Sequence, residues 1–130
     1  MKSFDELTQI ITSELGQINW NKEPRGLYEP IGYVLSLGGK RIRPVLTLMA
    51  CNLFSDEVQP TINTALGLEI FHNFTLLHDD IMDKADVRRG QLTVHKKWDE
   101  NTAILSGDVM QIASYQFIIQ TPEKYLKQSF

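Results

Sequence analysis

The sequence has very little cysteine and no long apolar run, and each scarcity excludes a class of protein. Cys51 is the only cysteine in 130 residues, so the chain has neither an internal disulfide framework nor a cysteine-rich zinc site, and we expect a reducing, cytoplasmic compartment. No apolar run approaches the length of about 18 residues that a membrane-spanning helix needs, so we expect no membrane span. Residues 1–6 become acidic before any apolar stretch, so we also expect no secretory signal.

Excess charge of either sign is small. The chain has 13 Lys and Arg against 16 Asp and Glu, which gives a formal net charge of −3. A surface built for nucleic acid is usually strongly basic, so we expect no nucleic-acid partner. Apolar residues make up 42% and charged residues 22% of the chain, which is enough apolar material for a packed core and argues against disorder of the whole chain.

Alternating strand patterns are also missing, whereas helical spacing of apolar residues recurs along the chain. Ser3 followed by Glu6 has the pattern of a capping box, which predicts a helix from Phe4. Asn101 is the expected N-cap of the last long helix. The sequence therefore predicts an all-α fold, with further helices over residues 30–37, 44–54 and 61–83.

The last residues have the pattern of a helix start. Thr121 can act as a cap, Pro122 suits the first turn, and the carboxylate of Glu123 would lie near the positive end of the helix dipole. The chain ends soon afterwards, at Phe130. We therefore expect this chain to be a fragment of a longer helical domain.

Three aspartates gather near the end of the helix predicted over residues 61–83. Because a helix advances about 100° per residue, His72, Asp79 and Asp83 share one stripe, and Asp80 flanks it. Like charges one turn apart repel each other, and the C-terminal end of a helix disfavours anions, so local stability does not explain them. A bound Mg²⁺ ion explains these aspartates, because Mg²⁺ takes one or two carboxylates and bridges to a substrate phosphate. A solvated, acidic helix end is the competing interpretation.

Basic residues gather in two segments that can bind an anion. Residues 38–44 read GGKRIRP, which places Lys40, Arg41 and Arg43 directly before a helix N-terminus. Cations are unfavourable there unless an anion is bound. The second segment is Arg-Arg-Gly at residues 88–90. Either segment alone is compatible with a solvated basic loop, but together with the aspartates they favour a metal-bound polyanion such as a diphosphate.

Four motifs, taken in order, resemble those of the trans-isoprenyl diphosphate synthases, the family of farnesyl and geranylgeranyl diphosphate synthases. They are GGKRIRP, FHNFTLLHDDIMD, RRG and ILSGD, and the resemblance covers about residues 27–120. It implies an all-α helical bundle of the isoprenoid synthase type, truncated here to its N-terminal helices. Residues 1–130 would then be the N-terminal part of a single polyprenyl synthase domain. The implied reaction is Mg²⁺-dependent condensation of isopentenyl diphosphate with an allylic diphosphate, carried out by a homodimer.

The resemblance also implies roles for individual residues. Asp79 and Asp83 would hold Mg²⁺ against the allylic diphosphate, with Asp80 in support. Arg88 would contact the same diphosphate, and these four are the expected catalytic residues. The remaining substrate-binding residues, expected at the isopentenyl diphosphate, are Lys40, Arg43, His72 and Arg89.

In this family, bulk just before the first aspartate limits the length of the product. Phe71, Phe74 and Thr75 occupy that region here. The resemblance therefore implies that they line a chain-length pocket and that the product is short, farnesyl or geranylgeranyl diphosphate. Ordinary core packing of Phe71 and Phe74 is an equally good interpretation.

The sequence departs from the family because it contains no second aspartate-rich motif, which in the family holds further Mg²⁺. We therefore expect little or no synthase activity from this chain alone, and the alternative is a non-catalytic, diphosphate-binding fragment or subunit. A metal phosphohydrolase with His78 and Asp79 as its His-Asp doublet is a third possibility. Such a site needs histidines from other helices, and the other two histidines are His72, on the same predicted helix, and His95.

Overall fold

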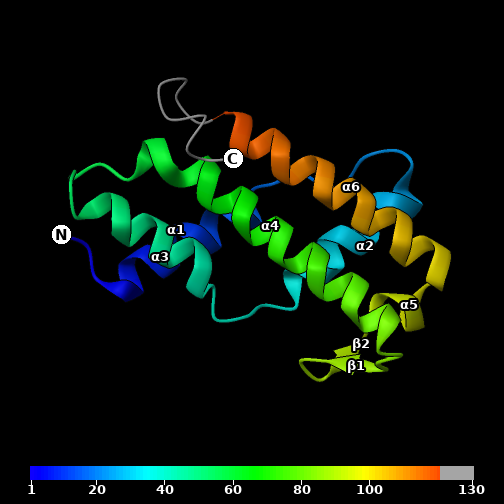
Figure 1. Ribbon diagram of the computed structural model, residues 1–130. Coiled ribbons are helices and arrows are strands. Elements are labelled where there is room, and N and C mark those ends of the chain that lie inside the picture. The colour runs from blue at the N-terminus through cyan, green and yellow to red at the C-terminus, as the bar shows by residue number, and fades with distance from the viewer. Residues whose placement is uncertain (121–130) are drawn as a thin grey trace. The chain divides into compact units, whose positions relative to one another are not determined.

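The computed structural model describes residues 1–120, and the helix start predicted at Thr121 lies outside the described residues. Six helices and one short hairpin follow one another in the order shown in Figure 1. None of the helices in this part of the chain is long and apolar enough to cross a membrane. The all-α prediction is confirmed. The elements are α1 Phe4–Gly16, α2 Arg25–Ser36, α3 Ile42–Asn52, α4 Gln59–Met82, β1 Val87–Arg88, β2 Gln91–Leu92, α5 Val94–Lys97 and α6 Glu100–Ile119.

The chain divides into two compact units. The first contains Met1–Ile18, Lys40–Glu69 and the end of α6 from Ala113, and the second contains Asn19–Gly39 and Ile70–Ile112. The two long helices, α4 and α6, each contribute a segment to both units. The candidate residues before α3 therefore belong to the first unit, and those at the end of α4 and in the hairpin belong to the second.

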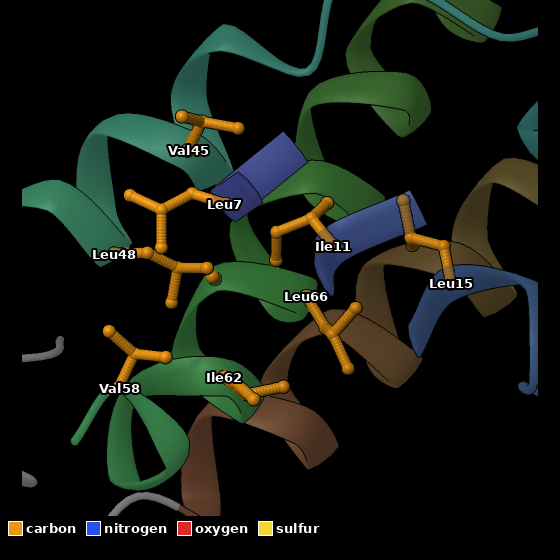
Figure 2. Close-up of a cluster of buried hydrophobic side chains, with 9 residues drawn as sticks. Leu7, Ile11, Leu15, Val45, Leu48, Val58, Ile62 and Leu66 are labelled. Atoms are coloured by element: carbon orange, nitrogen blue, oxygen red, sulfur yellow. The ribbon is translucent and has the colours of Figure 1, made fainter. Parts of the chain in front are cut away.

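The first unit is held together by a cluster of aliphatic side chains from α1, α3 and the start of α4 (Figure 2). In α1, Leu7, Ile11 and Leu15 recur every four residues on one face and are at most 7% exposed. Each fully buried aliphatic side chain contributes about 1.5–3 kcal/mol, so this cluster is the main source of stability in the unit. Its members are Leu7, Ile11, Leu15, Val45, Leu48, Val58, Ile62, Ala65 and Leu66.

The capping box predicted before α1 is present. The Glu6 amide donates to Ser3 Oγ at 3.1 Å, and the Ser3 amide donates to Glu6 Oε1 at 3.1 Å. These two bonds satisfy two backbone donors that a helix start otherwise leaves without partners. The backbone and side-chain hydrogen bonds with Ser3 also hold the pKa of the Glu6 carboxyl below its ordinary value.

Four helix starts differ from the prediction. Helices α3 and α4 each begin two residues earlier than predicted, at Ile42 and Gln59. Helix α2 begins at Arg25, so Pro30 lies inside the helix rather than at its start. Proline cannot donate the backbone hydrogen bond of a helix interior, and burial of the Pro30 ring offsets the free energy lost with that bond. Helix α6 is capped by Asp99, not by Asn101: the Thr102 amide donates to Asp99 Oδ1 at 2.7 Å. Hydrogen bonding to Thr102 lowers the pKa of Asp99.

The segment after α4 contains a β-hairpin. Val87 pairs with Leu92, and Arg88 pairs with Gln91. The two residues between these strands, Arg89 and Gly90, have φ angles of 52° and 77°, as a two-residue hairpin turn with a right-handed strand twist requires. Strands of two residues are too short to show an alternating pattern, which is why the sequence did not predict them.

Candidate functional site

Two aspartates project from the C-terminal end of α4 and are exposed. The Asp83 amide donates to the Asp79 carbonyl at 2.8 Å, so the helical turn continues through Asp83 and the two residues lie one turn apart on one face, as predicted. Both residues are exposed to solvent. A pair of hard, accessible oxygen donors at this spacing suits a hard divalent cation.

Asp80, between them, has different surroundings. It is only 7% exposed, and its carboxylate accepts two hydrogen bonds from one arginine. Arg88 Nε donates to Oδ2 at 2.8 Å, and Arg88 Nη2 donates to Oδ1 at 2.7 Å. This bidentate, charge-assisted geometry is the strong form of an arginine–carboxylate pair. The sequence predicted Asp80 beside the metal and did not predict this pairing.

The aspartates also act on the titration of Arg88. Hydrogen bonding to Asp80 raises the pKa of the guanidinium, against the effect of partial burial, and the charges of Asp79 and Asp83 act in the same direction. Arg88 is therefore a permanent cation at the acidic end of α4. One site thus combines two exposed carboxylates with a fixed positive charge, which is the composition that a metal-bound diphosphate requires.

The side chain of Arg89 extends to the loop between α2 and α3. Its Nη1 donates to the Gly38 carbonyl, and a Cβ added at Gly39 would lie 2.9 Å from its Nη2. Gly38 and Gly39 have φ angles of 83° and 141°, which non-glycine residues rarely adopt. Within the second unit, the group that approaches the backbone at these glycines is the Arg89 guanidinium.

The basic residues at the start of α3 have unequal surroundings in the first unit. Lys40 and Arg43 are exposed. Arg41 has a left-handed backbone and is buried, with Nη1 3.6 Å from Oε1 of Glu69 and side-chain exposures of 8% and 4%. Glu69 therefore neutralises one of the three cations that the sequence assigned to an anion site, and no local pattern identified Glu69 as its partner.

The residues predicted for the chain-length pocket lie on α4 and are half-buried. The rings of Phe71 and Phe74 meet edge to face, with centroids 5.3 Å apart. Thr75 Oγ1 donates to the carbonyl of His72 at 2.6 Å, and His72 is itself half-buried. The two aromatic rings therefore pack against each other in the second unit, which is compatible both with a pocket wall and with ordinary packing.

His78 lies at a close contact between α4 and α6. Its Nε2 lies 3.2 Å from the carbonyl of Ile104, and its ring contacts Phe74 edge to face at a centroid distance of 4.7 Å. A Cβ added at Gly107 would lie 2.2 Å from His78 Nε2. The imidazole thus fills a close contact between α4 and α6.

The donors on the described part of the chain fit Mg²⁺ only together with a substrate. Among residues 1–120, no group of three or more His, Cys, Asp or Glu side chains is arranged to hold a metal ion by itself. Mg²⁺ usually takes one or two carboxylates and completes its shell with water and phosphate oxygens. Asp79 and Asp83 supply those two carboxylates, so the donor set suits a Mg²⁺–diphosphate complex better than a resident metal ion.

Comparisons with known proteins identify the family. A model of the polyprenyl synthetase family matches residues 24–129. The geranylgeranyl pyrophosphate synthase of Geoglobus acetivorans is 37% identical over 110 residues, which are 85% of this chain and 34% of that protein. The farnesyl diphosphate synthase of Micrococcus luteus is 44% identical over 97 residues, which are 73% of this chain and 33% of that protein.

A solved structure supports the same assignment. A crystal structure of a geranylgeranyl pyrophosphate synthase matches 98% of this chain and 39% of its own, with a TM-score of 0.92 and 47% sequence identity. This likeness confirms the isoprenoid synthase type of helical fold. The chain spans about a third of the length of the curated relatives that it matches. The chain belongs to the polyprenyl synthetase family.

Proposed function

We propose that this chain is the N-terminal part of a single polyprenyl synthase domain that condenses isopentenyl diphosphate with an allylic diphosphate. The observation that carries the proposal is the exposed carboxylate pair Asp79 and Asp83 beside Arg88, whose charge is fixed by Asp80. Relatives named as geranylgeranyl and farnesyl diphosphate synthases support a short product of one of these two lengths.

In this proposal the acidic end of α4 binds the allylic diphosphate. Asp79 and Asp83 would hold Mg²⁺, which would supply positive charge to the diphosphate as a leaving group. Arg88 adds a permanent positive charge to the same diphosphate. Asp80 contributes by holding Arg88. Lys40, Arg43, His72 and Arg89 keep the role that the family resemblance implies, which is to bind isopentenyl diphosphate.

The reaction transfers the prenyl group from one carbon chain to another. The allylic carbon–oxygen bond breaks, and diphosphate leaves with both electrons. The double bond of isopentenyl diphosphate attacks the allylic carbon, a new carbon–carbon bond forms, and loss of a proton from the neighbouring carbon restores a double bond. Apolar walls protect the electron-poor carbon from water. We propose that Phe71, Phe74 and Thr75 belong to those walls and limit the length of the product.

Two further properties follow from the family resemblance and the composition. We propose that the complete protein is a cytoplasmic homodimer, in which α6 contributes to the contact between subunits. The lone Cys51, half-buried in the structure, is compatible with a reducing compartment.

The second candidate function is binding of a diphosphate without turnover. Asp79 and Asp83 are exposed and would bind a Mg²⁺–diphosphate complex whether or not a reaction follows.

Calorimetry with a thiolo analogue of an allylic diphosphate, which is not cleaved, tests the binding common to both functions. In the presence of Mg²⁺ we expect Asp79→Asn to weaken binding by at least about tenfold, since even outer-shell partners of a metal contribute that much. Asp108→Asn, which changes an exposed aspartate of α6, is the matched control. Equal affinities of the two variants would refute the proposed site. Radiolabelled isopentenyl diphosphate, supplied to the complete protein of which this chain is the proposed N-terminal part, then separates the two functions, because only a synthase incorporates it into a longer product.

A further inference from the structure

The β1–β2 hairpin, residues 87–92, carries both Arg88 and Arg89, and we refer to it as the arginine hairpin. Two-residue strands contribute few hydrogen bonds of their own, and an isolated hairpin is at best marginally stable in water. An arginine that must meet a diphosphate in one geometry needs a backbone that is held in place beforehand. Other residues must therefore fix this hairpin.

Thr93, directly after the hairpin, closes its base. It is 2% exposed. Its Oγ1 donates to the carbonyl of Ala85 at 2.9 Å and lies 3.4 Å from the carbonyl of Asp86. Its amide donates to the Asp86 carbonyl at 3.0 Å, and the Ala85 amide donates to the Asp80 carbonyl at 2.9 Å. One buried threonine thus connects the end of the hairpin to the segment that leaves α4.

Two more contacts hold the strands. Asp80 binds the Arg88 guanidinium through both carboxylate oxygens, which fixes β1. Tyr33 Oη donates to the carbonyl of Leu92 at 2.6 Å, which fixes β2, and the Tyr33 ring packs edge to face on Trp98. The cavity between the hairpin arginines, Asp80 and α2 measures about 10 Å³, which is room for a single water at most.

We propose that Thr93 is a positioning residue that, together with Asp80, holds the arginine hairpin in the pose in which Arg88 and Arg89 meet diphosphate. Thr93 is buried and acts through the two arginines, so it does not touch the substrate itself. This inference rests on the proposed function. Beyond that function, the affinity for diphosphate depends on the hydroxyl of Thr93, which belongs neither to the arginine pair nor to the aspartate cluster.

The test compares two substitutions at the same position. Thr93→Val keeps the shape of the side chain and removes the hydroxyl, whereas Thr93→Ser keeps the hydroxyl. Thr8→Val is the matched control, because Thr8 Oγ1 also donates to a backbone carbonyl, that of Phe4, at 2.8 Å, but lies in α1. Two quantities are measured: hydrogen exchange of the Arg88 Nε proton by NMR, and the dissociation constant of the uncleavable allylic diphosphate analogue with Mg²⁺.

We expect Thr93→Val to accelerate exchange of the Arg88 Nε proton and to raise the dissociation constant, each by about tenfold, as losses of buried hydrogen bonds and of supporting contacts usually do. Thr93→Ser and Thr8→Val should stay within about twofold of the wild type, because each leaves the hydroxyl of residue 93 in place. If Thr93→Val does not fold, Thr93→Ala replaces it, since it also removes the hydroxyl of residue 93.

Different results overturn different claims. If exchange of the Arg88 Nε proton is unchanged in Thr93→Val, the hydroxyl does not hold the hairpin. If exchange is faster but the affinity for the diphosphate analogue is unchanged, the hydroxyl holds the hairpin without affecting binding. Either result overturns the positioning role. A wild-type chain that binds no diphosphate in the presence of Mg²⁺ refutes the proposed function instead, so the two failures are distinguishable.

Discussion

The pairing of Arg88 with Asp80 predicts a large loss of stability when the arginine is replaced by methionine. The two side chains are 30% and 10% exposed and make two short hydrogen bonds. Arg88→Met leaves the Asp80 carboxylate buried without its counter-ion, and breaking a fully buried pair in this way costs about 3–5 kcal/mol. Because solvent reaches part of Arg88, we expect the free energy of unfolding to fall by about 2–3 kcal/mol.

The same substitution elsewhere in the chain gives the control. Arg25 lies 3.5 Å from Glu23, and the two side chains are 63% and 82% exposed, so Arg25→Met should change the stability by less than about 0.5 kcal/mol. Urea unfolding followed by circular dichroism measures both, and the comparison is valid if the m-value stays constant. The reasoning is wrong if Arg88→Met costs no more than Arg25→Met. Adding Asp80→Leu to Arg88→Met should recover part of the loss, because an apolar pair needs no counter-ion.

Two other predictions concern stability. A methyl group at Gly67 would lie 2.7 Å from the Ser114 carbonyl oxygen, so Gly67→Ala should lower the free energy of unfolding by about 1–3 kcal/mol. Gly16→Ala, with no atom within 4 Å, should leave it unchanged or raise it by up to about 1 kcal/mol, and thermal unfolding of both variants checks this contrast. The pKa of Glu6 is lowered from its ordinary 4.5, so its contribution to folding is present above pH 4.5 and is lost as the pH falls through the lowered value. NMR titration should show this lowered pKa in the wild type and a smaller lowering in Ser3→Ala, which loses the side-chain hydrogen bond and keeps the backbone one; an unshifted wild-type pKa would contradict the capping account.

The helices and the aspartate stripe could be predicted because they depend on neighbouring residues. Apolar side chains recurring at helical spacing place α1 and α4 close to their observed bounds. The capping box works across three residues, and the stripe of Asp79 and Asp83 follows from helix geometry alone. Each of these features is a property of one continuous segment.

Features that depend on long-range contacts could not be predicted. The partner of Arg41 is Glu69 in α4, and the group that fills the space at Gly39 is Arg89; no local pattern links these residues. Charge pattern alone placed Asp80 beside a metal, whereas the fold turns it inward toward Arg88. The hairpin escaped prediction for another reason, because its strands are too short for any periodicity.

The central claim is that the acidic end of α4 binds a diphosphate through Mg²⁺, and the Mg²⁺ dependence of binding tests it most directly. The measurement is the dissociation constant of the uncleavable allylic diphosphate analogue, determined by calorimetry over a series of Mg²⁺ concentrations. Ca²⁺-free buffer with a chelator gives the reference value without divalent cations. Because two carboxylates alone repel a diphosphate and a bound cation reverses that repulsion, the account predicts that affinity rises with Mg²⁺ and is negligible in the chelator. An affinity independent of Mg²⁺ would contradict it.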